Sequence, residues 1–220
     1  MKILLTGFEP FGRLRTNPSE QIVRKIAARP RSAKNELVAE ILPTEFGAAE
    51  KKIRRLIRVH RPAAVVCLGV AATRETICLE RIALNIDDEL SADNAGVVRQ
   101  GRAIAARGPL AYTSTLPLGR MLRLLQRNGI PAKISNHAGT YVCNHVFYAA
   151  RHEMERLGER APCGLIHVPV VRKKTKSSRE QRSEQRSKKP GMTLSEMVAA
   201  VEICIGLLAR APQRSDRNRT

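Results

Sequence analysis

Short apolar runs alternate with longer amphipathic stretches along this sequence, and this alternation limits the fold more than any other feature. The runs have the length of β-strands and lie at residues 2–6, 38–43, 63–69, 132–134 and 163–169. The stretches have the apolar spacing of helices and lie at 18–28, 46–59, 118–128, about 142–156 and 194–209. Strands that alternate with helices predict an α/β fold with a mostly parallel sheet. Since neither an internal repeat nor a second domain is evident, we expect one domain over residues 1–220.

Three further segments carry weaker or more local signals. Residues 76–85 alternate polar and apolar side chains over part of their length, which predicts an edge strand or a β-ribbon. Residues 87–96 are mostly polar and predict a loop. Thr-Leu-Ser-Glu at 193–196 is a capping box, which predicts that the last helix begins there.

The charge of the chain is large and unevenly distributed. The 220 residues are 43% hydrophobic, as expected for a globular domain, and carry a formal net charge of +19 that could attract a polyanion. Residues 172–190 hold nine Lys or Arg against two Glu, and residues 210–220 hold four Arg against one Asp. We expect the basic segment 172–190 and the polar tail from about 211 to be solvated and mobile. Aromatic residues make up only 3%, which disfavours stacking on single-stranded nucleic acid.

The composition also bears on compartment and cofactors. No apolar run approaches the ~18 residues of a membrane span, and the apolar start is too short for a signal peptide. The cysteines are odd in number and include no Cys-x-x-Cys pair; they are Cys67, Cys78, Cys143, Cys163 and Cys204. This usage predicts a reducing cytoplasm and argues against a disulfide framework or a zinc site. The histidines show no metal-ligand spacing, so we expect no metal site.

Cys143 is the strongest candidate for chemistry. It follows a polar loop that contains Gly139 and lies in the first turn of the helix expected from about residue 142. The helix dipole and free N–H groups at such a position stabilise a thiolate, which could act as a nucleophile. The alternative is a small buried apolar residue, as most free cysteines are. His145 is not expected to be its partner, because residues two apart on a helix do not face each other.

Other candidate residues lie close to the ends of strands. His167 interrupts an apolar strand near its end, where parallel sheets gather catalytic groups, although a core histidine is the alternative. Phe8 and Phe11 belong to a turn-rich loop after the first strand, where they either wall a pocket or anchor the loop in the core. Asn17 is a good N-cap for the helix that follows this loop. Glu80 is one of several acids in its region, and pairing with the neighbouring Arg is the simplest reading of it.

Four motifs resemble those of pyroglutamyl peptidase I, also called pyrrolidone-carboxylate peptidase, a family of cysteine peptidases. They are Gly-Phe-x-Pro-Phe-Gly at 7–12, Glu-Arg-x-Ala-x-Asn at 80–85, Ser-Asn-x-Ala-Gly-Thr-x-x-Cys-Asn at 135–144 and Gly-x-Ile-His-Val-Pro at 164–169. An Asn-Pro-Ser that begins at Asn17 also matches the family. The resemblance covers nearly the whole chain except 172–190 and the tail after about 210.

The resemblance implies a fold, an activity and a site. The fold would be a single-domain α/β/α sandwich with a mixed, mainly parallel sheet. The activity would be removal of N-terminal pyroglutamate from peptides, with no metal or other cofactor needed, by analogy in a homotetramer. The implied catalytic residues are Cys143 as nucleophile, His167 as base and Glu80 as the carboxylate that orients the base. Phe8 and Phe11 would line the pyroglutamyl pocket, and Asn17 is the third substrate-binding residue that we predict.

The sequence departs from the family in two places. Leu90 stands where the family usually has an Arg that helps to hold the oxyanion; Arg74 or Arg81 could replace that charge, or Leu90 could pack in the core. The basic segment 172–190 stands where the family usually has a Pro-Glu-Gln. Two alternatives therefore stay open: an inactive or substrate-altered family member, and a basic protein that binds RNA or another polyanion.

Overall fold

The computed structural model describes residues 1–12, 14–30, 36–172 and 191–210, which fold around one mixed, mainly parallel sheet. The strand order is β2-β1-β3-β9-β4-β7, with β8 also paired to β4. The bounds are β1 Lys2–Phe8, β2 Glu36–Leu42, β3 Ala64–Val70, β4 Ile77–Leu84, β7 Ala111–Thr113, β8 Ala132–His137 and β9 Cys163–Val168. Neighbouring strands run parallel except where β4 meets β9 and β7. The mostly parallel sheet that we predicted from the alternation of apolar runs and amphipathic stretches is confirmed.

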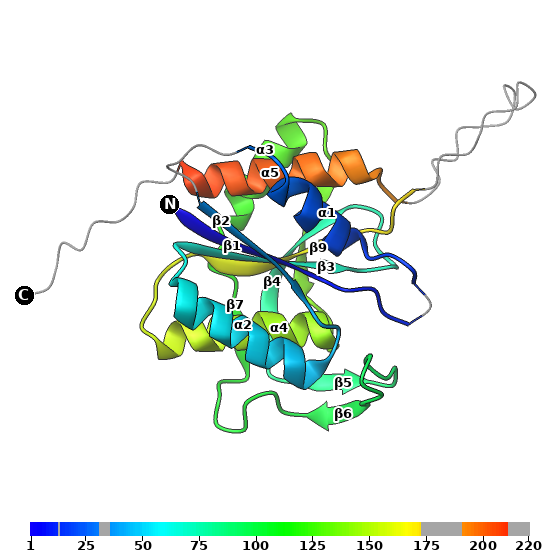
Figure 1. The fold of residues 1–220 in the computed structure, drawn as a ribbon, viewed down its shortest axis with the longest axis vertical. Coiled ribbons are helices and arrows are strands. Elements are labelled where there is room, and N and C mark those ends of the chain that lie inside the picture. Colours follow the sequence, from blue (N-terminus) through cyan, green and yellow to red (C-terminus); the bar gives the residue numbers. More distant parts are fainter. Residues whose placement is uncertain (13, 31–35, 173–190, 211–220) are drawn as a thin grey trace, which may run out of the picture.

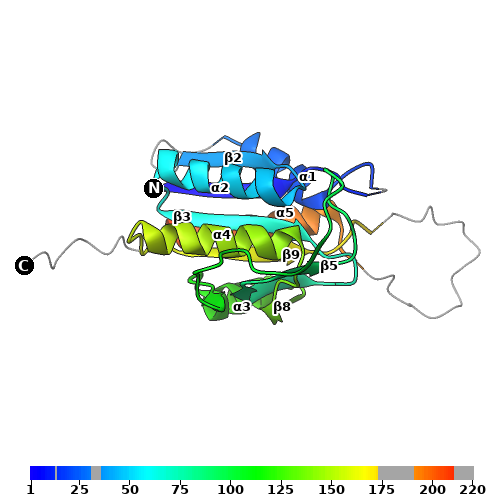
Figure 2. The ribbon, with the colours of Figure 1, turned by 90° about the horizontal axis from the view of Figure 1, so that it is seen from below.

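Helices cover both faces of this sheet (Figure 1). On one face lie α1 Pro18–Ala27, α3 Leu118–Arg127 and α5 Leu194–Ala209, and on the other α2 Phe46–His60 and α4 Val142–Arg156 (Figure 2). Alternate residues of a strand point to opposite faces and therefore enter different cores. Ile3 and Leu5 of β1 pack in the core beneath α1 and α5, whereas Leu4 and Phe8 pack in the core beneath α2 and α4. The predicted α/β/α sandwich is confirmed.

β4 is an interior strand, so the prediction of an edge strand or β-ribbon for residues 76–85 is wrong. It pairs with β8 along one side and with β9 and β7 along the other. Its first four residues, 77–80, are buried, and exposed side chains appear only from Arg81. Residues 87–96 are not entirely a loop either. β5 Asp87–Glu89 pairs with β6 Arg99–Arg102 in a separate hairpin at the lower right of Figure 1.

One sequence prediction lies outside this description. The basic segment from 173 to 190 and the tail from 211 to 220 are not among the described residues, so their expected mobility stays a prediction. Within the described ranges, no helix combines the length and the apolar character that crossing a membrane requires.

Gly7 sets how closely β1 approaches α1. A Cβ on residue 7 would lie 2.7 Å from the carbonyl oxygen of Ser19, closer than real Cβ atoms come. A hydrogen bond also joins β1 to α1 here, since the Phe8 N–H donates to Ser19 Oγ at 3.0 Å. We expect Gly7→Ala to lower the free energy of unfolding by about 1–3 kcal/mol, as measured by urea denaturation.

Gly206→Ala is the matched control for this substitution. Gly206 lies in α5, and a Cβ there would meet nothing within 4 Å. Because glycine is a poor helix former, alanine at residue 206 should raise the free energy of unfolding by up to about 1 kcal/mol. A Gly7→Ala protein as stable as the wild type would show that β1 and α1 can move apart freely.

Candidate active site

The candidate nucleophile lies where α4 begins. α4 starts at Val142, so Cys143 is in its first turn, and its side chain is partly exposed. The first helical hydrogen bond runs from the N–H of His145 to the carbonyl of Tyr141. The N–H groups of residues 142–144 therefore have no partner inside the helix. These groups and the helix dipole favour negative charge at the sulfur or on an oxygen bound beside it.

The antiparallel pairing of β9 with β4 brings His167 and Glu80 together. This pairing sets Cys78 opposite His167, and Glu80 is the next residue on the same face of β4. His167 Nδ1 lies 2.8 Å from Glu80 Oε1, and the two residues are only 5% and 0% exposed. Because the carboxylate accepts at Nδ1, the other ring nitrogen, Nε2, is left to face Cys143.

Cys143 and His167 meet over Gly69 of β3. Gly69 is the partner of His167 in the β3–β9 register. A Cβ on Gly69 would lie 2.7 Å from Cys143 Sγ and 3.0 Å from His167 Nε2, so both atoms border the same small space. A side chain at residue 69 would occupy that space. The structure thus brings together the three residues predicted as catalytic, from α4, β9 and β4, while sequence reasoning missed Gly69.

The surroundings of His167 favour its protonated form. Burial alone would lower the pKa of His167, but hydrogen bonds with Cys143 and Glu80 outweigh it and raise the pKa to about 9. A protonated imidazole beside a cysteine is the usual means of activating a sulfur nucleophile. Burial raises the pKa of the Cys67 thiol and of the Cys204 thiol to about 12, so these two buried thiols stay protonated.

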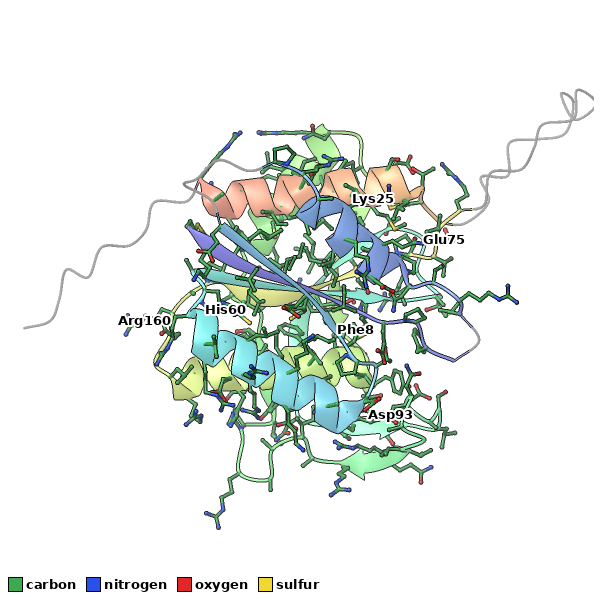
Figure 3. The ribbon with its side chains drawn as sticks, viewed as in Figure 1. Phe8, Lys25, His60, Glu75, Asp93 and Arg160 are labelled. Atoms are coloured by element: carbon green, nitrogen blue, oxygen red, sulfur yellow. The ribbon has the colours of Figure 1, made fainter. Side chains whose placement is uncertain are left out.

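Two aromatic rings form a corner beside the start of α4. Phe11 is partly buried, and its ring centroid lies 6.2 Å from that of Tyr141, the residue before α4. Phe8, labelled in Figure 3, is 2% exposed and packs in the core with Phe46. Of the two predicted pocket rings, Phe11 is therefore the more accessible. Sequence reasoning missed Tyr141, for which the only signal was its place before the helix.

Asn17 holds the loop that carries Phe11. It is 1% exposed, and its Oδ1 accepts from the N–H and the hydroxyl of Ser19 at 2.9 and 2.8 Å. Its Nδ2 donates to the carbonyl of Glu9 at 3.0 Å. These bonds tie the start of α1 to the loop after β1. The structure therefore gives Asn17 the predicted capping role and sets it behind the loop that carries Phe11, with its carboxamide bonded to other protein groups.

Asn144 fixes the first turn of α4 to the end of β4, which sequence reasoning also missed. Its Oδ1 accepts from the Leu84 N–H at 2.9 Å, and its Nδ2 donates to the carbonyls of Leu84 and Ile86 at 2.9 and 3.0 Å. Asn144 is fully buried. Since Cys143 is adjacent to it, these bonds hold the sulfur in a fixed position relative to the strand that carries Glu80.

Leu90 lies in the loop between β5 and β6 and is 77% exposed, so the alternative that it packs in the core is wrong. Of the two bases that could replace the family's Arg, Arg81 is exposed. Arg74 is partly buried, and its Nη2 donates to Ser135 Oγ at 3.3 Å. Ser135 is the β8 partner of Glu80. Arg74 is therefore the base whose side chain reaches the surroundings of the candidate triad.

A cysteine at a helix start with a buried His–Glu pair beside it, on an α/β/α sandwich, is an arrangement typical of cysteine-dependent hydrolases. In the part of the chain that the structure describes, no group of three or more His, Cys, Asp or Glu is placed to hold a metal ion. The sequence profile of the pyroglutamyl peptidase family matches residues 1–211. The chain belongs to this family of cysteine peptidases, which remove N-terminal pyroglutamate.

Individual relatives agree with the family assignment. The pyrrolidone-carboxylate peptidase of Oceanobacillus iheyensis is 40% identical over 207 residues, which cover 94% of this chain and 98% of that protein. A solved structure of a mutant pyrrolidone carboxyl peptidase from Pyrococcus furiosus has a TM-score of 0.83 at 33% identity, covering 94% and 98% of the two chains. Pyroglutamyl peptidase I of Bacillus amyloliquefaciens has a TM-score of 0.83 at 32% identity, covering 96% and 97%.

Proposed function

We propose that Cys143, His167 and Glu80 are the catalytic triad with which this protein removes pyroglutamate from the N-terminus of peptides. One observation carries the proposal: Cys143 Sγ and His167 Nε2 border the same space over Gly69, while Glu80 binds the other nitrogen of the ring. Glu80 keeps the imidazole in the orientation and charge state that the reaction needs.

The reaction has two steps. In the first, the Cys143 thiolate attacks the pyroglutamyl carbonyl carbon, and the C–N bond breaks while His167 Nε2 gives its proton to the leaving amine. In the second, His167 takes a proton from water, whose oxygen attacks the thioester carbon; the C–S bond then breaks, which releases pyroglutamate and restores the Cys143 thiolate beside the protonated His167. The N–H groups at the start of α4 stabilise the oxyanion in both steps, at roughly 3–4 kcal/mol for a well-placed donor.

The pocket is proposed to lie at the corner formed by Phe11 and Tyr141, with Phe8 beneath it. Pyroglutamate has a neutral lactam in place of a charged amine, so apolar walls with a few hydrogen bonds suit it. Asn17 supports this wall from behind through its bonds to Ser19 and Glu9.

A fluorogenic pyroglutamyl amide tests this function directly on the purified protein. Hydrolysis that iodoacetamide abolishes, together with no hydrolysis of the corresponding alanyl amide, supports a thiol peptidase specific for pyroglutamate. No hydrolysis under reducing conditions, with salt-sensitive binding of RNA, would instead support the polyanion-binding alternative.

Leu90→Arg tests the clearest departure from the family. Leu90 is 77% exposed, so we expect an arginine there to leave the melting temperature unchanged. A cation near the oxyanion acts in the transition state, so kcat should rise, by up to about a hundredfold, with little change in KM. If kcat stays at the wild-type value, either Arg74 already supplies the charge or this loop is aligned wrongly with the family. Arg74→Gln separates these two explanations. A lower kcat in Arg74→Gln identifies Arg74 as the substitute, and no effect of either change shows that the alignment of this loop is wrong.

We further propose that the enzyme is a cytoplasmic homotetramer whose single peptidase domain spans the chain. All five cysteines are free and four of them are buried, which suits a reducing compartment. The tetramer rests on the resemblance to the family. Sedimentation equilibrium should give about four times the chain mass of 24.4 kDa, and a monomer at micromolar concentration would contradict the proposal.

A further inference from the structure

His145 is a buried residue whose two ring nitrogens both face carboxylates. It lies two residues after Cys143 and is 0% exposed. Its Nδ1 is 2.8 Å from Asp87 Oδ2, and its Nε2 is 3.3 Å from Glu50 Oε2. A neutral imidazole has a single N–H and would turn a lone pair toward one of the carboxylates. Only the doubly protonated ring donates to both, so this geometry calls for a buried cation at residue 145.

Asp87 connects this cation to the β5–β6 hairpin. Asp87 is fully buried in β5 and also accepts from Arg99 Nη1 of β6 at 2.6 Å. The Arg99 guanidinium lies 4.6 Å from the centroid of the Phe46 ring, at the start of α2. Asp93 of the hairpin loop, labelled in Figure 3, accepts from the Phe46 N–H at 2.9 Å. The charged groups that face His145 are Glu50 from α2 and Asp87 from β5, and these carboxylates pair in turn with Arg54 of α2 and Arg99 of β6.

The loop of this hairpin supports both sides of the aromatic corner. Asn94 Nδ2 donates to the carbonyl of Pro10 at 2.9 Å, in the loop that carries Phe11. The Tyr141 hydroxyl donates to the carbonyl of Ala92 at 2.9 Å. A displacement of the hairpin would therefore remove a support from each of the two rings.

We infer that His145 is a positioning residue whose cation clamps the β5–β6 hairpin against α2 and α4 and thereby sets how tightly the pocket binds substrate. The inference rests on the proposed function, because the pocket is the one proposed for the pyroglutamyl ring. The clamp does not set the bond-breaking step. Asn144 bonds the first turn of α4 to Leu84 and Ile86 independently, so Cys143 keeps its position without His145.

The electrostatics agree with the geometry. Burial alone would lower the pKa of His145, but hydrogen bonds with Asp87 and Glu50 outweigh it and raise the pKa. The hydrogen bond from His145 is the largest cause that lowers the pKa of Glu50 to about 2, against the opposing effect of burial; the charge of His145 and the Arg54 guanidinium lower it further. Because the pKa of His145 is higher in the folded protein, the stabilisation by the clamp is complete below pH ~6.5 and is lost as the pH rises through the raised pKa.

Kinetics and hydrogen exchange on the full chain test the clamp. His145→Gln introduces a neutral side chain that can donate toward only one of the two carboxylates. With the fluorogenic pyroglutamyl amide, KM should rise about tenfold while kcat stays within about threefold of the wild type. Amide exchange over residues 87–102 should become about tenfold faster, with exchange in β3 unchanged. Asp87→Asn should have the same two effects, because it removes the charge that the cation pairs with.

His152→Gln is the matched control, on the same helix and with the same chemical change. His152 Nδ1 lies 2.8 Å from the Tyr112 hydroxyl, away from the hairpin, so KM and exchange at 87–102 should stay at wild-type values. If His145→Gln does not fold, Asp87→Asn provides the same test. Unchanged KM and unchanged exchange in the folded variants would overturn the inference. If the wild-type protein does not hydrolyse the amide, the proposed function is refuted instead. Amide exchange over residues 87–102 needs no substrate, so it would still test whether His145 holds the hairpin in place.

Discussion

Cys143→Ala is expected to abolish pyroglutamyl hydrolysis while the protein stays folded. Without the sulfur no nucleophile remains at the site, so kcat should fall by about 10⁴-fold or more. The change is small, and alanine is a good helix former in the first turn of α4, so the melting temperature should stay close to that of the wild type. Steady-state kinetics and a thermal melt of the purified variant measure the two quantities.

Cys67→Ala and Cys204→Ala are the controls for this result. The two side chains are buried in the cores on opposite faces of the sheet. Burial raises the pKa of each to about 12, so iodoacetamide should label neither in the folded protein. Each substitution should lower the free energy of unfolding by about 1 kcal/mol and leave kcat unchanged. Equal loss of activity in all three folded variants would contradict the assignment of Cys143.

Elements with consistent local signals could be predicted from the sequence almost to the residue. The last helix was expected at 194–209 and spans Leu194–Ala209, because the Thr193–Glu196 capping box and the apolar pattern agree. β4 was assigned wrongly, since its place in the sheet depends on β7, β8 and β9, which lie far along the chain. A local pattern of side chains does not encode which distant strands will pair with it.

The same limit applies to the candidate site. Cys143 and His167 were candidates from their places at a helix start and near a strand end, whereas Glu80 was assigned only from a family motif, and each lies in a helix or strand that the sequence indicated. Gly69 was missed because its importance arises only from the register between β3 and β9. His145 was excluded as the partner of Cys143, and its ring indeed bonds Asp87 and Glu50. Its clamp was missed because no local pattern shows that two distant carboxylates will meet at one histidine.

Glu80→Gln should lower kcat by about 10³- to 10⁴-fold, the second-largest effect that we expect. Glu80 is fully buried, and its Oε1 lies 2.8 Å from His167 Nδ1. Glutamine keeps the shape but removes the charge that favours the imidazolium, and its amide N–H can face Nδ1 and select the wrong tautomer. Glu75→Gln is the matched control, because Glu75 is exposed on the turn before β4 (Figure 3) and should leave kcat unchanged.

The pH dependence of the Glu80→Gln variant separates loss of the charge from a general disturbance of the site. In the wild type, kcat/KM should fall at alkaline pH as the His167 imidazolium loses its proton near its pKa of about 9. Burial lowers the pKa of His167, and the Glu80 carboxylate is one of the groups that raise it. Because Glu80→Gln removes that carboxylate charge, the pKa should be lower in the variant, and the alkaline fall should move to lower pH. Rate profiles and an NMR titration of the His167 ring, with a melting curve as the check on folding, measure the shift. A folded variant with kcat within about tenfold of the wild type and an unchanged alkaline fall would show that Glu80 does not act on the imidazole.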